Sequence, residues 1–263
     1  MEGKIDIKLP ALRPVIQKIL AIIDNPNASA YLVATEISQD PALTAKILGI
    51  VNSPFYGFPQ RISSLSHAVV VLGMGVLKGI LIAIHFSDEK YDPNIMPFIL
   101  TLWQHQTDCS YAISEILSFY NKLLKDAKNS PAIITAALLH DIGKAIIAQN
   151  HPKRALSVYK ANDLEAEKEV FSFTHEDVNL YLCEKWMLPD ALKYPISFHH
   201  RPEEVPEIFW KETALIHLVD AIINEKKPKQ EAIDILQISN KELEEIENRI
   251  TNILSTKLTM KRP

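Results

Sequence analysis

The chain has 263 residues, 47% of them apolar, and a formal net charge of −4 at pH 7. This length can hold one large domain or two small ones, and the apolar content excludes a largely disordered chain. The net charge offers no electrostatic reason for a nucleic-acid partner, so we expect none.

Helical spacing of apolar residues dominates the chain, and no pair of alternating strands joined by a hairpin turn is recognisable. The seven glycines are too few for a turn-rich β fold. The sequence therefore predicts an all-α, multi-helix fold. In chain order, the expected helices cover residues 11–23, 28–38, 41–51, 65–72, 74–86, 95–124, 131–148, a short segment after 152, 175–185, a segment that ends near 199–200, 212–224, and the charged tail after 239.

Three helix starts are marked by a residue that caps helices well. Asp40 and Ser130 are each followed by a proline, which is favoured at the first helical position. Thr174 precedes a first turn that contains two acidic residues, and these are favourable at that end of a helix. Residues 125–129 form an expected polar loop ahead of Ser130.

The stretch 68–86 is mostly apolar and long enough to be considered as a membrane span. Lys78 lies at its centre, His85 lies near its end, and Gly73 and Gly75 interrupt it. We therefore expect two buried helices that are broken near Gly73, and no membrane partner.

The number and spacing of the cysteines indicate the cellular compartment in which the protein folds. The two cysteines, Cys109 and Cys183, are not spaced as a metal-binding pair, and their number suits a reducing cytosol. The N-terminal residues lack the basic and apolar regions of a signal peptide. We expect a cytoplasmic protein.

Residues 87–94 are polar and contain a proline, so they are the best candidate boundary between two parts of the chain. This segment is too short for a long flexible linker, and the two parts should therefore pack together.

The tail from residue 225 is strongly charged, and Ser239 and Glu242 form a capping box within it. An amphipathic stripe follows, formed by Leu243, Ile246, Ile250, Ile253, Leu254 and Leu258. Such a stripe is expected to dock on the surface of the domain, and a homodimer contact is the alternative.

Residues 136–148 read as an apolar helix with one polar stripe, formed by His140, Asp141 and Lys144. His140 and Lys144 are four residues apart and share a helix face. Burying an unpaired carboxylate, imidazole or ammonium group is unfavourable by several kcal/mol. These three side chains therefore need partners. They can pair with one another, with other side chains or with a metal.

Seven of the nine histidines lie between positions 105 and 217. Five of these histidines and one carboxylate are candidates to share a site with His140, Asp141 and Lys144. They are His105, His175, His199, His200, His217 and Asp220. Taken singly, these histidines also fit roles outside a metal site. His105 would then be a core histidine, His175 would only begin a helix, and His217 would bond Asp220 three residues further on. Together they favour one inward-facing site, because imidazole and carboxylate suit divalent metals and a helix bundle can direct both to one point.

The order His105, His140-Asp141, Asp220 resembles the H…HD…D signature of the HD superfamily of metal-dependent phosphohydrolases. Within that superfamily the sequence is most similar to the HDOD family, named for an HD-related output domain. The similarity runs from about residue 9 to residue 224. It rests on residues 40–44, 52–56, 62–73, 103–105, 138–144, 186–189 and 199–200.

The resemblance implies an HDOD-like bundle in which an N-terminal helical part (residues 9–87) packs on an HD-like part (residues 94–224). Residues 225–263 then form a charged helical extension. It also implies a role in bacterial signalling or regulation.

Many HDOD members are thought to have lost the metal-binding residues and to act as interaction modules, whereas this sequence retains all four expected ligands. Lys144 matches the lysine that often follows the His-Asp pair. The additional histidines are similar to those of the HD-GYP family, which hydrolyses cyclic di-GMP. Residues 201–203 read Arg-Pro-Glu instead of a Gly-Tyr-Pro element, so the resemblance does not extend to that activity.

Two functions are consistent with these implications. In the first, the chain is a regulatory module that acts through contacts with protein partners. In the second, it is a metal-dependent phosphohydrolase acting on a nucleotide or another phosphoester, with Asp141 and Lys144 as the catalytic residues. The metal ligands, for Fe, Mn, Zn or Mg, are then His105, His140, Asp141 and Asp220, and a second metal or a phosphate is bound by His175, His199 and His200.

Overall fold

A computed structural model of the chain describes residues 5, 7–120, 130–159 and 164–260. Every regular element in this part of the chain is a helix, which confirms the all-α prediction. In chain order these are α1 (Pro14–Ile23), α2 (Ala30–Ser38), α3 (Pro41–Val51), α4 (Leu65–Leu72), α5 (Met74–Ser87), α6 (Met96–Phe119), α7 (Ser130–Leu139), α8 (Ile142–Asn150), α9 (Pro152–Val158), α10 (Leu164–Phe171), α11 (His175–Lys185), α12 (Asp190–Ser197), the 3-10 turns η2 (Pro202–Glu204) and η3 (Glu207–Phe209), α13 (Trp210–Ile223), α14 (Gln230–Leu236) and α15 (Asn240–Met260).

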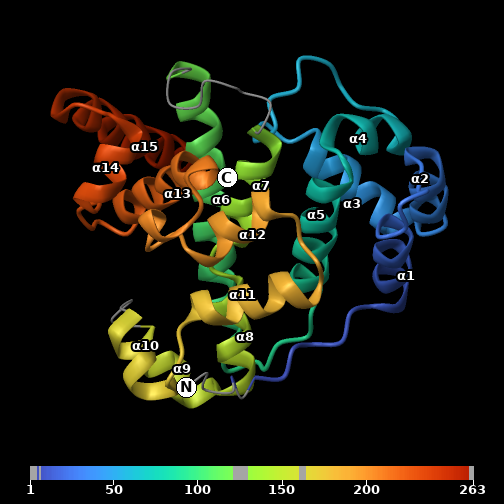
Figure 1. The fold of residues 1–263 in the computed structure, drawn as a ribbon, viewed down its shortest axis with the longest axis horizontal. Helices are drawn as coiled ribbons and strands as arrows, with labels where there is room; N and C mark the ends of the chain where they lie inside the picture. Colours follow the sequence, from blue (N-terminus) through green and yellow to red (C-terminus); the bar gives the residue numbers. More distant parts are fainter. Residues whose placement is uncertain (1–4, 6, 121–129, 160–163, 261–263) are drawn as a thin grey trace.

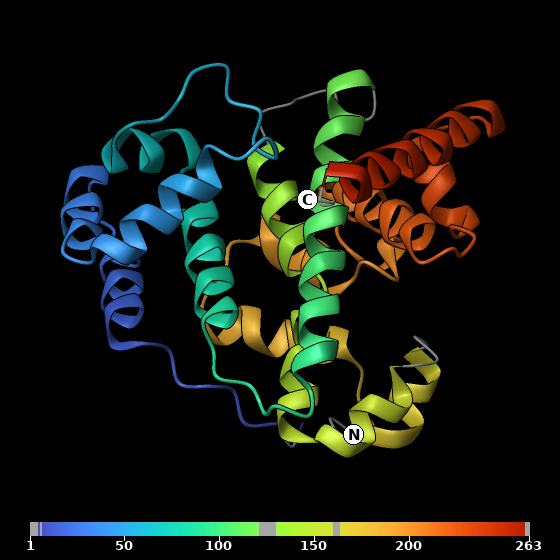
Figure 2. The ribbon, with the colours of Figure 1, turned by 180° about the vertical axis from the view of Figure 1, so that it is seen from behind.

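Helices α1 to α5 lie together on one side of the molecule, and the later helices gather around α6 and α7 (Figure 1). The long helix α6 runs through the middle of this second part, as the reverse view shows (Figure 2). The segment before α1 crosses back to the second part, where the Lys8 N–H donates to Asn150 Oδ1 at 3.0 Å. The two parts pack on each other, as the sequence predicted.

Contacts between the two parts centre on α5 and α7. The hydroxyls of Tyr56 and Thr135 lie 2.7 Å apart in the buried interface. Gly79 of α5 lies so close to α7 and α12 that a Cβ there would be 2.7 Å from Thr135 Cγ2 and 2.9 Å from Leu192 Cδ1. The absence of a side chain at this position therefore allows the helices of the two parts to approach closely.

The expected break near Gly73 is confirmed, because the direction of the chain bends by 113° between α4 and α5. Residues Pro131–Asn150 are long and apolar enough to cross a membrane by length and composition, but 89% of their most apolar window is buried inside the protein. A core helix passes the same test, so this stretch is a weak indication of a membrane span.

The expectation of one helix through residues 136–148 is wrong. Helix α7 ends at Leu139 and α8 begins at Ile142, so His140 and Asp141 lie in a tight turn between them. A side chain from α11 interrupts the helical hydrogen bonds there: Asn179 Oδ1 accepts from Gly143 N–H at 2.8 Å, and its Nδ2 donates to His140 O at 2.5 Å. The two site residues are thereby released from helical geometry.

Other expected boundaries differ by a few residues. Helix α1 begins at Pro14, where proline occupies the first helical position, instead of at residue 11. Helix α12 ends at Ser197, so His199 and His200 lie in the turn after it. The caps at Asp40 and Thr174 are confirmed. The helix expected to reach residue 124 ends at Phe119, because Tyr120 leaves helical geometry with φ −113° and ψ 61°. The expected loop at 125–129 and the side chain of Ser130 lie outside the described residues.

The C-terminal helix α15 docks on the second part of the chain. Ile246 and Ile250 of its apolar stripe are buried, and Tyr120 donates a hydrogen bond to Glu245 Oε2 at 3.0 Å. The capping box at Ser239 and Glu242 is present. A homodimer contact through the rest of the stripe stays a prediction. Helix α14, which the sequence did not reveal as a separate element, precedes α15.

The close approach at Gly79 predicts a stability effect. In Gly79→Ala the new methyl group meets Thr135, whose χ1 is stiff, and we expect the free energy of unfolding to fall by about 1–2 kcal/mol despite the better helix propensity of alanine. Gly49→Ala is the control, because a Cβ at Gly49 would have no neighbour within 4 Å. Urea unfolding of both variants measures the difference, and equal effects would contradict the packing argument.

Candidate metal centre

Five separate segments bring the predicted site residues to one place. Helix α6 provides His105, the α7–α8 turn provides His140 and Asp141, α11 provides His175, the turn after α12 provides His199 and His200, and α13 provides Asp220. Two sets of their ligand atoms share no residue, and a third set, formed by His140, Asp141 and His199, links them.

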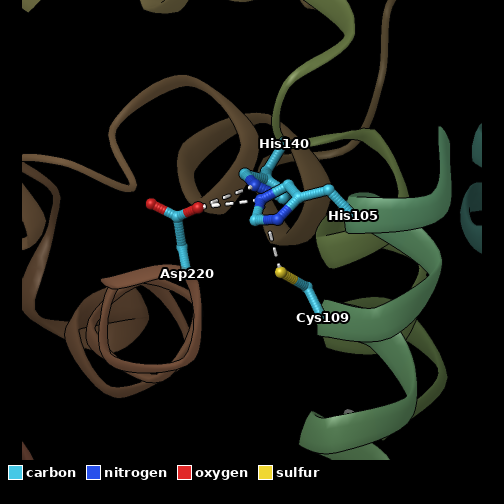
Figure 3. Close-up of side chains that lie close together, drawn as sticks. All are labelled: His105, Cys109, His140 and Asp220. Carbon is cyan, nitrogen blue, oxygen red and sulfur yellow. Dashed lines mark hydrogen bonds and ion pairs between the residues drawn. The ribbon is translucent and has the colours of Figure 1, made fainter. Parts of the chain in front are cut away.

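The first donor group consists of His105, His140 and Asp220, and Cys109 lies beside it (Figure 3). Asp220 Oδ1 lies 2.9 Å from His105 Nε2 and 3.5 Å from His140 Nε2. The sulfur of Cys109 is 3.6 Å from His105 Nε2. All four ligand atoms lie within 4.8 Å of one another, a spacing that one cation can span.

The second donor group consists of His175, His199 and His200. The Nε2 atoms of His175 and His199 are 3.3 Å apart. His200 is tightly packed against both rings. Three imidazoles at this spacing match the nitrogen donors of a first-row metal site.

Asp141 lies between the two groups and presents one carboxylate oxygen to each. Its Oδ1 is 3.3 Å from His175 Nε2 and 3.6 Å from His199 Nε2. Its Oδ2 is 3.9 Å from His105 Nε2 and 3.7 Å from His140 Nε2. This is the placement of a carboxylate that can bridge two cations.

The ring orientations of three histidines are set by acceptors behind them. His140 Nδ1–H donates to Ala137 O at 2.7 Å, and His199 Nδ1–H donates to Ile196 O at 3.1 Å. His175 Nδ1 contacts the buried carboxylate of Glu167 at 2.8 Å. A proton held at Nδ1 leaves the Nε2 lone pair facing the centre, which is the form that binds metals.

Two buried polar atoms at the centre have no hydrogen-bond partner among the described residues. They are His140 Nε2 and Asp141 Oδ1. An unsatisfied buried polar group costs about 1–3 kcal/mol, so a folded protein rarely leaves two of them together. The residues present therefore fit a metal, whose coordination would satisfy both atoms.

The carboxylates are ionised despite their burial. Burial alone would raise the pKa of Asp141, but the Lys144 ammonium, 2.8 Å from Oδ2, outweighs it and holds that pKa well below its usual range. Burial lowers the pKa of His200, and the neighbouring His199 adds to this effect. His200 is therefore neutral at pH 7, as a metal ligand must be.

His217 is not part of either donor group. Its Nδ1–H donates to His199 O at 2.9 Å, and its Nε2 accepts from the Lys229 N–H at 3.1 Å. The alternative in which His217 bonds Asp220 is not what the structure shows, because Asp220 faces His105 instead. The second nitrogen is occupied by the chain that leads into α14, so His217 holds the turn of the second donor group.

Sequence reasoning missed four residues that support or adjoin the centre: Cys109, Glu167, Glu176 and Asn179. Cys109 follows His105 by four residues on a helix, a spacing that could have revealed it. Glu176 accepts from the His200 N–H at 2.8 Å and from Arg201 Nε at 3.0 Å. Glu167 lies on a different helix from its partner His175, and no spacing rule connects them.

Asn179 has the widest influence of these residues. Its Nδ2 also donates to Ile196 O at 2.9 Å, the same carbonyl that orients His199. Gly143 donates its N–H to Asn179 Oδ1. Gly143 also packs so tightly on α11 that a Cβ there would lie 2.3 Å from His175 O. One buried amide thus fixes the relative positions of three segments that carry donors.

The helices of this all-α fold converge on a centre of histidine and aspartate side chains. The HDOD domain model matches residues 9–202, and the chain belongs to the HDOD family. Asp220 lies beyond the matched residues but within the expected similarity.

Solved structures share this fold. A candidate metal-dependent phosphohydrolase from Shewanella amazonensis SB2B is 17% identical, with 93% of each chain covered and a TM-score of 0.65. An HDOD domain protein of unknown function from Geobacter sulfurreducens is 22% identical, with 96% of this chain and 91% of that chain covered and a TM-score of 0.60. A candidate signal transduction protein from Marinobacter aquaeolei VT8 is 21% identical, covers 96% of this chain and 59% of that chain, and has a TM-score of 0.60.

A curated relative from Treponema pallidum (strain Nichols), itself uncharacterised, is 24% identical over 219 residues. The match covers 76% of this chain and 39% of that protein, so the chain spans about two fifths of the relative's length.

The role of Asn179 predicts a joint loss of stability and metal affinity. Asn179→Asp keeps the shape and the acceptor but removes both donated hydrogen bonds, so we expect the free energy of unfolding to fall by about 2–4 kcal/mol. Zn²⁺ affinity should fall by about 10–100-fold, the usual effect of losing a group that orients ligands. Thermal unfolding and metal titration measure the two effects.

Asn150→Asp is the matched control, because Asn150 makes its hydrogen bonds near the surface, to Lys8 O and Ile146 O. If Asn179→Asp bound Zn²⁺ as tightly as Asn150→Asp does, Asn179 would not position the donors.

Proposed function

We propose that the chain is an HDOD module of bacterial signal transduction that hydrolyses a phosphoester at a divalent metal centre. The observation that supports this most is the carboxylate of Asp141, which is buried, ionised and directed at both donor groups at once. A fold that kept this centre only for structure would have no reason to bury a carboxylate whose Oδ1 lacks a hydrogen-bond partner among the described residues.

In this proposal the first donor group and Asp141 hold one cation, and the second donor group with the other oxygen of Asp141 holds a second. Bound divalent cations supply the chemistry by lowering the pKa of water and polarising a phosphoryl oxygen. Mn²⁺, Fe²⁺ and Zn²⁺ all suit imidazole and carboxylate ligands, whereas Mg²⁺ prefers oxygen ligands.

Lys144 has two roles in this proposal. Its Nζ lies 2.8 Å from Asp141 Oδ2, where it balances the carboxylate charge and fixes its orientation. In the proposal its positive charge also stabilises the negative charge that develops on the phosphoryl group, as the sequence led us to expect. Lys144 is buried, and its burial strengthens the attraction to the carboxylate.

A small cavity of about 210 Å³ opens onto the second donor group. His175, His200 and Asp220 line its inner wall, and its rim contains Lys226, Lys227 and Lys229. Lysines at a cavity mouth attract anions and raise their local concentration. The cavity is smaller than the roughly 300–1,000 Å³ of pockets that enclose a whole ligand. We infer that a terminal phosphoryl group enters while the rest of the phosphoester stays outside.

The name of the Shewanella amazonensis structure, a candidate metal-dependent phosphohydrolase, is consistent with this proposal.

The decisive experiment compares the wild-type chain with a His140→Ala, Asp141→Ala double variant. We expect the wild type, purified without chelators or reloaded with Mn²⁺, Fe²⁺ or Zn²⁺, to retain metal and to hydrolyse at least one member of a phosphoester and nucleotide panel. The double variant should lose both properties. Elemental analysis and phosphate release measure them, and His67→Ala, which changes an exposed histidine on α4, is the control.

Absence of metal in the wild type after reloading would overturn the proposal. Bound metal without hydrolysis of any substrate in the panel would leave a metal-binding regulatory module, the second candidate.

That second candidate, a module that acts through protein contacts, is favoured by one surface feature. Tyr31 and Leu32 of α2 are 74% and 48% exposed, and Val70 of the neighbouring α4 is 68% exposed. These exposed apolar side chains on two neighbouring helices make α2 and α4 the candidate protein-binding surface. The structure from Marinobacter aquaeolei VT8, a candidate signal transduction protein, is consistent with such a role.

This candidate predicts that the apolar surface, and not the metal centre, determines partner binding. Tyr31→Ser, Val70→Ser should lose the proteins that the wild type captures from cells of its source, while the His140→Ala, Asp141→Ala variant should retain them. Leu100→Ser is the control, because Leu100 is 62% exposed on α6. Equal capture by all variants, measured by quantitative mass spectrometry, would rule out this surface.

A further inference from the structure

The first donor group has a sulfur atom beside it. Cys109 lies on α6 one helical turn after His105 and is fully buried. Its Sγ is 3.6 Å from His105 Nε2 and within 4.8 Å of the ligand atoms of His140 and Asp220 (Figure 3). A thiol in this position faces polar ligand atoms, although a buried free cysteine usually acts as a small apolar side chain.

The other cysteine shows what that ordinary role looks like. Cys183 is also fully buried, and its Sγ accepts a weak hydrogen bond from Ser197 Oγ at 3.9 Å. It belongs to none of the donor sets found among the described residues. The two cysteines are therefore equally buried but differ in what their sulfur atoms face.

A second, independent observation points to a ligand at the same place. His140 Nε2 is buried, has no hydrogen-bond partner among the described residues and belongs to the same four-atom set as Cys109 Sγ. Its Nδ1 is already bonded to Ala137 O, so the ring cannot turn to satisfy Nε2 without losing that bond. The unpartnered nitrogen and the sulfur thus face one common space.

The four donors match one type of cation in kind, and Asp141, which the proposed function assigns to the same cation, would be a fifth ligand, which zinc sites accept when they expand to five-coordinate. Zn²⁺ is four-coordinate in most protein sites, with Zn–S near 2.3 Å and Zn–N and Zn–O near 2.0–2.2 Å. Tetrahedral geometry then places neighbouring donors roughly 3.3–3.8 Å apart. The distances from Asp220 Oδ1 to the two histidine Nε2 atoms, 2.9 and 3.5 Å, and from Cys109 Sγ to His105 Nε2, 3.6 Å, lie near this range. A thiolate and the Asp220 carboxylate would also neutralise the divalent charge in a buried site.

We propose that Cys109 is a metal ligand, and that with His105, His140 and Asp220 it makes the first donor group selective for thiophilic cations such as Zn²⁺, Co²⁺ and Fe²⁺ over Mg²⁺. This inference rests on the metal centre of the proposed function. Binding forms the metal–sulfur bond and breaks the S–H bond, and the proton leaves to solvent. Thiolate ligands favour these metals because both partners are soft.

The test uses Co²⁺ as a spectroscopic substitute for Zn²⁺ in the full-length protein, kept reduced. A cobalt–thiolate bond gives an intense sulfur-to-cobalt charge-transfer absorption in the near ultraviolet, separate from the visible bands of bound Co²⁺. We expect this absorption in the wild type and in Cys183→Ser, and its loss in Cys109→Ser and Cys109→Ala. Zn²⁺ affinity should fall by at least about 10-fold in both Cys109 variants, with a smaller change for Mn²⁺.

The outcomes separate this inference from the function on which it rests. Visible bands without the charge-transfer absorption would show that the metal centre exists and that Cys109 is not its ligand. Failure of the wild type to bind Co²⁺ would overturn both proposals. If the Cys109 variants do not fold, Cys183→Ser still decides the question, because Cys109 is then the only cysteine in the chain. Loss of the absorption in Cys183→Ser would overturn the assignment.

Discussion

The side-chain amide of Asn179 holds together the segments on which the candidate centre depends. Its three hydrogen bonds reach the turn that contains His140, the first turn of α8 and the end of α12. Each bond replaces one that a continuous helix would make within itself, so the backbone can leave helical geometry without leaving polar groups unsatisfied. The turn at His140 and Asp141 is possible because an amide from another helix takes over these hydrogen bonds. The local structure at His140 and Asp141 therefore depends on a tertiary contact with α11.

The centre also concentrates groups that are unfavourable to bury. Imidazoles and carboxylates from five segments meet where solvent is largely excluded, and such a cluster is stable only if each charge and lone pair is satisfied. Lys144, Glu167 and Glu176 satisfy part of this need through charged hydrogen bonds. Within the described part of the chain, two atoms of the centre lack a hydrogen-bond partner, and they are His140 Nε2 and Asp141 Oδ1. A cation bound there would contribute to folding as well as to chemistry, since the unfolded chain does not hold the donors together.

Much of the fold could be predicted because helical periodicity and caps are local signals. The caps at Asp40 and Thr174 and the break at Gly73 follow from residues within a few positions. The donor residues could be proposed because imidazole and carboxylate groups recur on apolar helices. The break after Leu139 could not be foreseen, because Asn179 lies far along the chain from it. For the same reason no spacing rule connects Glu167 with His175, and only the folded arrangement of α10 and α11 does so.

The position of Asp220 has a consequence for how this domain can be divided. The family match ends at residue 202, in the 3-10 turn before α13, yet Asp220 contacts both histidines of the first donor group. His217, on the same helix, holds the turn that contains His199. An excised fragment ending at the family boundary would keep the His-Asp pair and lose the carboxylate opposite it. The smallest unit that retains the full set of donors is therefore longer than the segment by which the family is recognised, and it extends at least through α13.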